Sequence, residues 1–190
     1  NALYPAVSAS AFLYLLHNQH MLANCAMHAG RYHDAITTAH ELAQSIDSAS
    51  LSMPPPMGSA LQYLYMTSAL LNVRFEKWDS LLSMQKPDSQ FIYANVLYHF
   101  GRGMALVANN RVDEAKEEAR QMEEMMKNES LKIPMTPFSP AIDGAIVANG
   151  ILKGFISHKE NKNDEAIIHL KKAAETEEMM KEHAEENDLT

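Results

Sequence analysis

The chain has 190 residues, a length that fits one domain or two small ones. It carries 16 Lys and Arg residues against 24 Asp and Glu residues, and the net charge of −8 argues against capture of nucleic acid or of an anionic membrane. The single cysteine excludes an internal disulfide framework and a cysteine-built zinc site. The hydrophobic share of 46% and the scarcity of Gly and Pro indicate a folded, helix-rich protein.

The start of the sequence indicates how this stretch relates to a longer chain. The chain opens on Asn1 and Ala2, without an initiator Met and without the basic-then-apolar pattern of a signal peptide. We therefore expect an excised piece of a longer protein, with Asn1 and Ala2 outside the fold. No run reaches the roughly 18 apolar residues of a membrane span. We expect no membrane insertion, and a cytoplasmic location is favoured.

Apolar residues recur at helical spacing along the whole chain, and no stretch shows the period-two alternation of a β-strand. The predicted helices cover, in chain order, residues 8–28, 32–46, 60–74, 77–84, 89–109, 112–128, 141–159 and 164–182. Segments 47–59 and 133–140 are rich in proline, which lacks the backbone donor that a helix needs, and are predicted to be loops. The acidic end of the last helix is expected to fray. The pattern therefore predicts four helix pairs.

The turns inside these pairs align with one another. Each turn places Asp or His at the start of the second helix and a small or apolar residue two places later. Those later residues are Ala35, Leu81, Ala115 and Ala166. Leu81 and Ala115 are 34 residues apart, which is the length of a tetratricopeptide repeat. The other two intervals exceed 34 by 12 and by 17 residues, and both excesses fall in the proline-rich loops.

On this register and these small residues, the chain resembles a tetratricopeptide repeat protein over nearly its whole length. The small residue on each first helix is matched by Ala23, Ala69, Gly103 and Gly154, and the one on the second helix by Ala35, Ala115 and Ala166. Leu81 departs from the pattern, only Leu170 fits the bulky residue that follows, and the terminal prolines are largely absent. The histidine-rich first unit also looks like a segment of longer bacterial members of the family.

The resemblance implies an all-α fold, an α-α superhelix of about eight antiparallel helices in four hairpins. One repeat domain would span residues 3–186, with units at about 8–46, 60–84, 89–128 and 141–182. In such a solenoid the first helix of each unit lines the concave face. The residues expected there to contact a partner are His20, Asn24, Tyr63, Met66, Leu70, Arg74, Phe100, Met104 and Phe155.

This expected face begins polar and becomes apolar and rich in methionine, which suits a peptide or helix partner. Packing under further repeats or under a loop explains the same stripe equally well. Some family members bind the carboxylate tail of chaperones through a clamp of Lys and Arg. The matching positions here hold His20, Asn24, Thr67, Leu97 and Gly101, of which only Asn24 agrees, so this ligand is disfavoured.

Several side chains raise the question of chemistry in the first two units. His17 and His20 share a helix face with His28 two turns beyond, but a metal site needs a third ligand on the same face, and we expect no metal and no cofactor. Cys25 is expected to be buried and inert, and Trp78 to pack between helices rather than to anchor a partner. The glutamates of 112–128 and 164–182 are expected to form solvated faces with nearby Lys and Arg.

Three functions remain open at this point. The first is a non-enzymatic scaffold that presents a concave groove to a peptide or helix of a partner protein. The second is a regulatory or spacer solenoid inside a larger chain, and the third is a metal or enzyme site built on the histidines of the first unit. Because an isolated repeat array lacks polar caps, we also expect a homodimer through a terminal helix.

Overall fold

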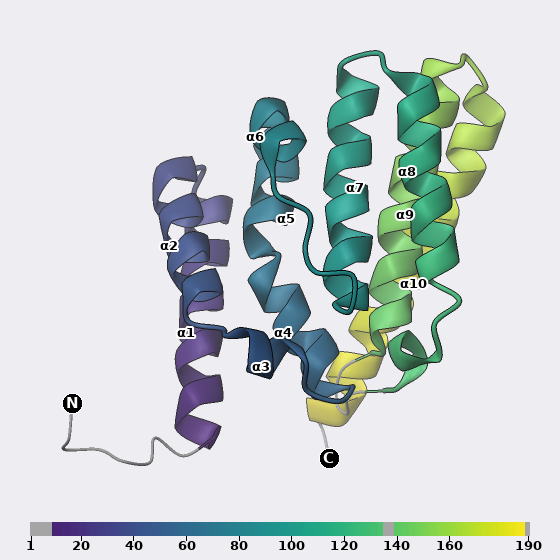
Figure 1. Cartoon of the computed structure of the whole chain (residues 1–190). Helices are drawn as coiled ribbons and strands as arrows, with labels where there is room; N and C mark the ends of the chain where they lie inside the picture. The colour runs from purple at the N-terminus through teal and green to yellow at the C-terminus, as the bar shows by residue number, and fades with distance from the viewer. Residues whose placement is uncertain (1–8, 135–138, 189–190) are drawn as a thin grey trace.

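The computed structural model describes residues 9–134 and 139–188, and within these ranges the chain is all-α without a β-strand. Figure 1 shows the helices standing side by side in chain order. They are α1 (Ala9–His28), α2 (Tyr32–Gln44), α3 (Ser48–Leu51), α4 (Met57–Tyr65), α5 (Thr67–Arg74), α6 (Trp78–Ser83), α7 (Ile92–Ala108), α8 (Val112–Met125), η1 (Glu129–Lys132), α9 (Ala141–Lys159) and α10 (Asn163–Asp188). The predicted all-α class is therefore confirmed.

The longer helices form hairpins that pack on one another. The two helices of each hairpin pack on one another, and the pairs are α1 with α2, α5 with α6, α7 with α8, and α9 with α10. Between hairpins, α2 contacts α5, α6 contacts α7, and α8 contacts α9, while α7 also packs directly on α9. In Figure 1, α1 and α2 form the left edge and α10 lies on the right. Each hairpin thus contacts the next one along the chain.

The four hairpin turns share one backbone geometry. Gly30, Glu76, Asn110 and Asn161 each have a positive φ, between 55° and 72°. In every turn the amide that follows this residue donates to a carbonyl five residues earlier, at 2.8 to 2.9 Å. This is the pattern with which a left-handed residue ends a helix and satisfies its last carbonyls. The predicted alignment of the four turns therefore corresponds to four equivalent structures.

Small residues let neighbouring helices approach closely. Ala23, Ala35 and Ala115 have no exposed surface, and Ala69 has 1%. A Cβ added at Gly103 would lie 2.6 Å from a methyl of Leu152 on α9, and one at Gly154 would lie 2.7 Å from Leu170 on α10. These contacts are too short for any larger side chain without movement of the neighbour. The small-residue positions predicted from the register therefore lie at helix–helix contacts.

The structure corrects the predictions for segment 47–59 and for the helix after it. The segment holds the short helix α3, whose first turn is capped by Asp47 accepting from the Ser50 amide at 2.7 Å, and α4 begins inside it at Met57. The predicted helix 60–74 is broken at Met66, where the Thr67 hydroxyl donates to the Leu64 carbonyl at 2.8 Å. A side-chain hydroxyl that bonds back to the preceding turn bends a helix.

The carboxyl-terminal part follows the predictions more closely, with one correction. The predicted helix 141–159 is confirmed as α9. The last helix does not end near residue 182 but continues to Asp188, so the expected fraying of its acidic end is wrong. Lys171, Lys172 and Lys181 interleave with the glutamates of α10, and this spacing supports the helix. The predicted loop 133–140 includes residues 135–138, which lie outside the described residues.

Candidate binding groove

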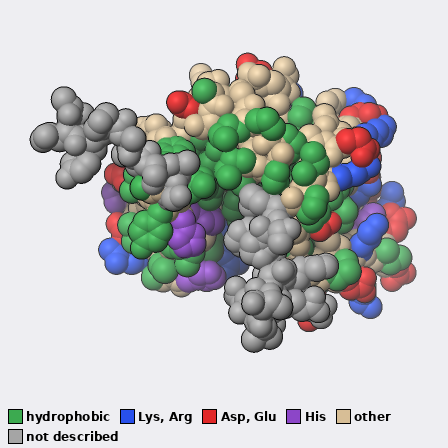
Figure 2. Space-filling model, turned by 90° about the horizontal axis from the view of Figure 1, so that it is seen from below, with side chains coloured by type: hydrophobic (Ala, Val, Ile, Leu, Met, Phe, Trp, Pro, Cys, Tyr) green, Lys and Arg blue, Asp and Glu red, His purple; other side chains and the backbone are tan. Residues whose placement is uncertain are grey.

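A cavity of about 700 Å³ opens where the first helices of the four hairpins face one another. Its walls come from α1, α4, α5, α7 and α9, and the segment before α9 contributes Ile133, Ser139 and Pro140. The carboxyl-terminal half of α10 closes another side with Glu177 and Met180. Figure 2, which views the molecule from below, shows hydrophobic side chains spread across the face, with charged side chains mostly at its right. We refer to this cavity as the groove.

A row of rings crosses the groove from one helix to the next. His20 of α1 meets the ring of Tyr63 of α4 edge-on, with 5.5 Å between centroids. Tyr63 stacks on Tyr93 of α7, with 6.4 Å between centroids and 18° between planes. Beyond it, a Cβ added at Gly144 of α9 would lie 2.3 Å from the Tyr93 hydroxyl oxygen, so only glycine leaves room for that ring. All four residues line the groove.

The groove is close to uncharged. Burial, with a smaller contribution from His17, lowers the pKa of His20 below its ordinary value. Asn24 donates its amide to the His20 ring at 3.3 Å, an arrangement that requires an unprotonated ring nitrogen. Burial raises the pKa of the Tyr63 and Tyr93 hydroxyls, so both stay protonated at neutral pH. Among the lining residues, Glu177 is the one permanent charge, and it pairs with Lys181 at 3.1 Å.

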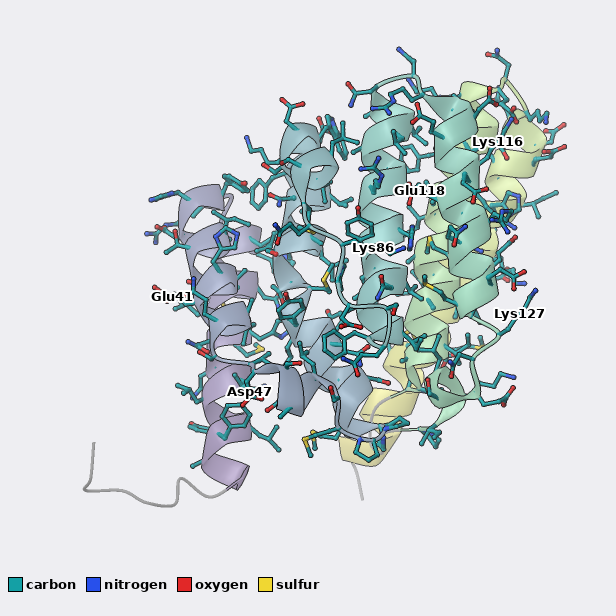
Figure 3. All side chains as sticks on the ribbon, in the orientation of Figure 1. Glu41, Asp47, Lys86, Lys116, Glu118 and Lys127 are labelled. Carbon is teal, nitrogen blue, oxygen red and sulfur yellow. The ribbon has the colours of Figure 1, made fainter. Side chains whose placement is uncertain are left out.

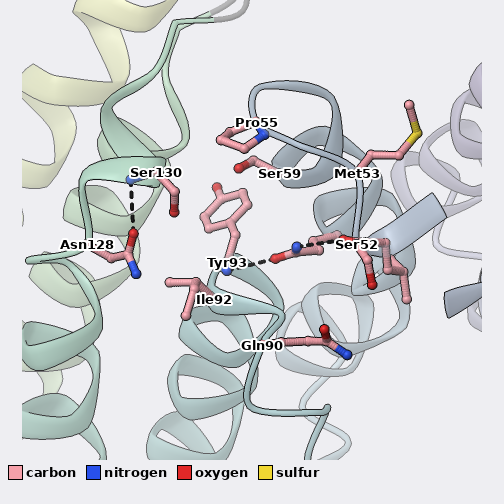
Figure 4. Close-up of a pocket in the computed structure, with 11 residues that line it drawn as sticks. Ser52, Met53, Pro55, Ser59, Gln90, Ile92, Tyr93, Asn128 and Ser130 are labelled. Atoms are coloured by element: carbon pink, nitrogen blue, oxygen red, sulfur yellow. Dashed lines mark hydrogen bonds between the residues drawn. The ribbon is translucent and has the colours of Figure 1, made fainter. Parts of the chain in front are cut away.

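A second, smaller pocket of about 360 Å³ lies on the other side of Tyr93. Figure 4 shows residues around it from the segment between α3 and α4, from the start of α7 and from the segment after α8, which contributes Asn128 and Ser130. Its buried Gln62 accepts from the Tyr93 and Ala94 amides at 2.9 and 3.2 Å and donates to the Leu51 carbonyl at 3.0 Å. These bonds engage both the oxygen and the nitrogen of the Gln62 amide in holding the helices together.

Four of the nine residues predicted to contact a partner line the groove. His20, Tyr63, Leu70 and Phe100 come together there, and so do their neighbours His17, Leu97 and Ile151. Asn24 touches the groove only through its bond to His20. Arg74 and Phe155 are exposed but lie outside the groove lining.

The expected exposure of Met66, Phe100 and Met104 is wrong. All three belong to the main hydrophobic core, with 3%, 6% and 7% of their surface exposed, although Phe100 still lines the groove. Met66 lies at the break between α4 and α5. Met104 lies on α7, which is covered on nearly every side by α5, α6, α8 and α9. A central helix of this kind offers few residues to a groove.

Sequence reasoning missed four residues that line the groove, which are Tyr93, Gly144, Glu177 and Met180. Tyr93 lies one helical turn before Leu97 and extends the same stripe, so continuing the spacing toward the start of α7 would have found it. Glu177 and Met180 belong to a second helix, whereas only first helices were expected on the concave face. Both residues fall within the predicted last helix, 164–182, so the helix was expected but its contact with the groove was not.

The other side chains that suggested chemistry have plainer surroundings. No group of three or more His, Cys, Asp or Glu residues that could hold a metal ion occurs among the described residues. Cys25 is exposed, so its expected burial is wrong. Trp78 is half-buried and packs against the main core, as predicted. In the described part of the chain, no helix combines the length and apolar character needed to cross a bilayer.

The comparisons with known proteins found no match to a family model, to a curated protein or to a solved structure.

Proposed function

We propose that the protein is a non-enzymatic interaction scaffold whose groove binds the apolar face of an amphipathic helix from another protein. The observation that carries this proposal is the groove itself, a 700 Å³ cavity with apolar walls and a row of three aromatic rings. Cavities of this size are typical of sites that bury most of a bound group. A helix would insert bulky side chains at i, i+3, i+4 and i+7.

The chemistry of the lining favours a partner with basic rather than acidic flanks. Neither Lys nor Arg lines the groove, the permanent charge at its rim is Glu177, and the whole chain carries a net charge of −8. Opposite charge at the rim of an apolar site speeds encounter and orients the ligand. Met21 and Met180 lie at the margins, and unbranched methionine side chains adapt to different apolar surfaces.

The tetratricopeptide-like arrangement is part of this proposal. Four turns of one geometry, small residues at the helix contacts and contact of each hairpin with the next support a repeat solenoid. In such an array the first helices line one continuous surface, and the row His20, Tyr63, Tyr93 and Gly144 takes one residue each from α1, α4, α7 and α9.

Calorimetric titration with model helices tests the proposal. The probe is a Leu–Lys peptide with leucines at helical spacing, compared with a scrambled peptide of the same composition and with a Leu–Glu peptide. We expect saturable binding of the first peptide alone. Tyr63→Ala should weaken it about tenfold or more, because a central aromatic anchor is lost.

Phe155→Ala is the matched control for Tyr63→Ala. Phe155 is also an exposed aromatic residue on a first helix, but it lies outside the groove. Its removal should leave the affinity unchanged. Equal losses in the two variants, or equal binding of the ordered and scrambled peptides, would overturn the groove as the binding site. Circular dichroism establishes that both variants keep their helix content.

A further inference from the structure

The outer face of α1 is apolar although no helix covers it. Tyr14, Leu15, Met21 and Leu22 are 68%, 52%, 45% and 59% exposed. On the opposite face, Leu16 and Ala23 have no exposed surface, because that side packs on α2 and the core. A helix that is hydrophobic around its whole circumference normally has neighbours on all sides. We call the face with Tyr14, Leu15, Asn18, Leu22 and Cys25 the outer stripe.

The outer stripe is distinct from the groove. Leu13, His17 and His20 of α1 point to the groove, with Met21 at the border between the two surfaces. The stripe residues Tyr14, Leu15 and Leu22 do not line the groove. A partner on the stripe would therefore leave the groove open.

The charge distribution favours a second copy of the chain as the partner of the outer stripe. α1 contains no Lys, Arg, Asp or Glu in 20 residues, whereas the acidic side chains concentrate on α8 and α10 at the other end of the molecule. Figure 3 places the labelled Lys116, Glu118 and Lys127 on this far side. In a two-fold symmetric contact the same patch faces itself, so any charge near the axis meets its own like charge. The outer stripe avoids this repulsion.

The opposite end of the molecule also exposes apolar side chains, including Ile167 and Ile168 at 50% and 65%. There, however, α10 carries more acidic than basic residues, so pairing two copies at this end brings net negative charges together. At the stripe, Tyr14, Leu15 and Leu22 are each more than half exposed, so a contact between two copies buries six large apolar side chains without an acidic one among them. Exposed Tyr and Met are also enriched in interfaces.

We propose that the outer stripe of α1 is a homodimer interface, occupied by the outer stripe of a second copy of this chain. The contact is two-fold symmetric and buries Tyr14, Leu15 and Leu22 from both copies. It places the two grooves on one particle, so that the dimer presents two sites for a partner helix. Two linked sites bind a bivalent partner more tightly than either site alone. The dimer itself does not depend on the groove having that function.

Sedimentation velocity over a range of protein concentrations tests the interface. The unaltered chain should show a reversible monomer–dimer equilibrium. The double variant Leu15→Glu with Leu22→Glu should sediment as a monomer throughout, because two copies would bury four like charges. The matched control is Ile167→Glu with Ile168→Glu, which adds the same charge to exposed positions of α10 and should still dimerise. Circular dichroism establishes that both double variants are folded.

Cys25 supplies a second measurement, because it is exposed and lies on the outer stripe. Alkylation of its thiol should slow several-fold as the concentration of the unaltered chain rises through the dimerisation range. It should stay at the monomer rate in Leu15→Glu with Leu22→Glu.

Three outcomes would overturn the proposal. A monomer at every concentration would assign the stripe to a different protein. Association that survives in the α1 double variant would place the contact elsewhere. Loss of association in both double variants would indicate a head-to-tail contact between α1 and α10. Peptide binding by the monomeric α1 variant would leave the proposed groove function standing, so the two proposals fail separately.

Discussion

The two halves of the molecule join their helices by different interactions. Up to α6, no ion pair joins two of the described helices. Their polar contacts are of other kinds, such as the Tyr32 hydroxyl donating to Asn72 at 2.9 Å and the Lys77 ammonium lying 4.8 Å from the centroid of the Tyr32 ring. From α7 onward, ion pairs connect the helices, with Lys116 bound to Glu160 and Lys153 bound to Glu123. Before α7, the one ion pair between described residues joins Arg31 to Asp34 at the start of α2.

This difference matches the position of the outer stripe, which lies on α1 in the first half, where apolar and aromatic side chains remain partly exposed. The groove takes its walls from both halves, because α7, α9 and α10 line it together with α1, α4 and α5. The charged half carries most of its glutamates on outward faces of α8 and α10, as the sequence predicted. The expected solvation is wrong for Glu118, whose side chain is 14% exposed and packs against His99 and Arg102. An end without charges is suited to binding other apolar surfaces, whereas the net negative charge of the other end repels the same end of another copy.

The largest expected effect on stability concerns the hydrogen bonds of Gln62, which join helices at the boundary between the two halves. Gln62→Leu leaves the Tyr93 and Ala94 amides and the Leu51 carbonyl without their partner. Unpaired buried backbone groups are costly, and we expect the free energy of unfolding to fall by about 3 kcal/mol. Urea denaturation followed by circular dichroism measures the change.

Gln90→Leu is the control for Gln62→Leu. Gln90 lines the same small pocket but is exposed, and its substitution should alter stability little. Equal destabilisation by the two substitutions would show that the hydrogen bonds of Gln62 do not hold the halves together.

The second-largest effect concerns a buried ionic contact, which joins helices of the second half. Glu118 is largely buried and accepts from His99 Nδ1 at 2.5 Å and from Arg102 Nε at 3.0 Å. Arg102 also donates to the Leu82 carbonyl at 3.3 Å, which links α6, α7 and α8. We expect Glu118→Gln to lower the free energy of unfolding by about 2 kcal/mol, because a buried charged partner is lost while Arg102 keeps partial access to water.

Glu117→Gln on the same helix separates burial from charge. Hydrogen bonds from Arg120 and then Gln121 lower the pKa of Glu117 to about 2, yet the side chain is exposed, and solvent screens the pair. Urea denaturation should therefore show little change for Glu117→Gln. A larger loss in Glu117→Gln than in Glu118→Gln would contradict the view that the second half depends on its buried pair.

The third expected effect is a pH dependence that belongs to the first half. Because burial and then His17 lower the pKa of His20 in the folded state, the unfolded chain binds the proton more readily. Stability is therefore lost as the pH falls below the ordinary value of 6.5, until the folded pKa is passed. His20→Gln removes this contribution, so its stability relative to the unaltered chain should improve as the pH falls from 8 to about 5.

Denaturation curves at several pH values measure this change, and NMR titration of His20 checks the cause. A His20 resonance that titrates at or above pH 6.5 would remove the basis of the prediction. The same protonation would place a positive charge inside the groove. Binding of the Leu–Lys peptide should weaken over the same pH range.

The sequence predicted the parts of this fold that depend on neighbours along the chain. Ala35, Ala115 and Ala166 mark the hairpin turns because helix-start residues and small residues act within one turn of helix. The break at Met66 was not predicted, because the apolar spacing of residues 60–74 runs through it without a Gly or Pro. Met66 is buried at this break.

The candidate groove was predicted only in part, because its members come from separate helices. Tyr63 and His20 followed from helical spacing, but the place of Tyr93 depends on the space that Gly144 leaves on α9. Glu177 and Met180 lie within the predicted last helix but were missed, because only first helices were expected to line the groove. Residues that meet across three helices leave no periodic signal in any one of them.

The smallest expected effect compares the turns of the two halves. Asn and Gly adopt the left-handed conformation at little cost, and they occupy this turn position at Gly30, Asn110 and Asn161. Glu76, in the first half, adopts the same conformation with a φ of 55°, which is unfavourable for a glutamate. Glu76→Gly should therefore raise the free energy of unfolding by about 0.5 kcal/mol, the strain relieved being partly offset by the greater freedom of glycine in the unfolded chain. Asn110→Gly should gain less, and urea denaturation of the two variants compares them directly. A larger gain at Asn110 than at Glu76 would show that the strain is not concentrated in the first half.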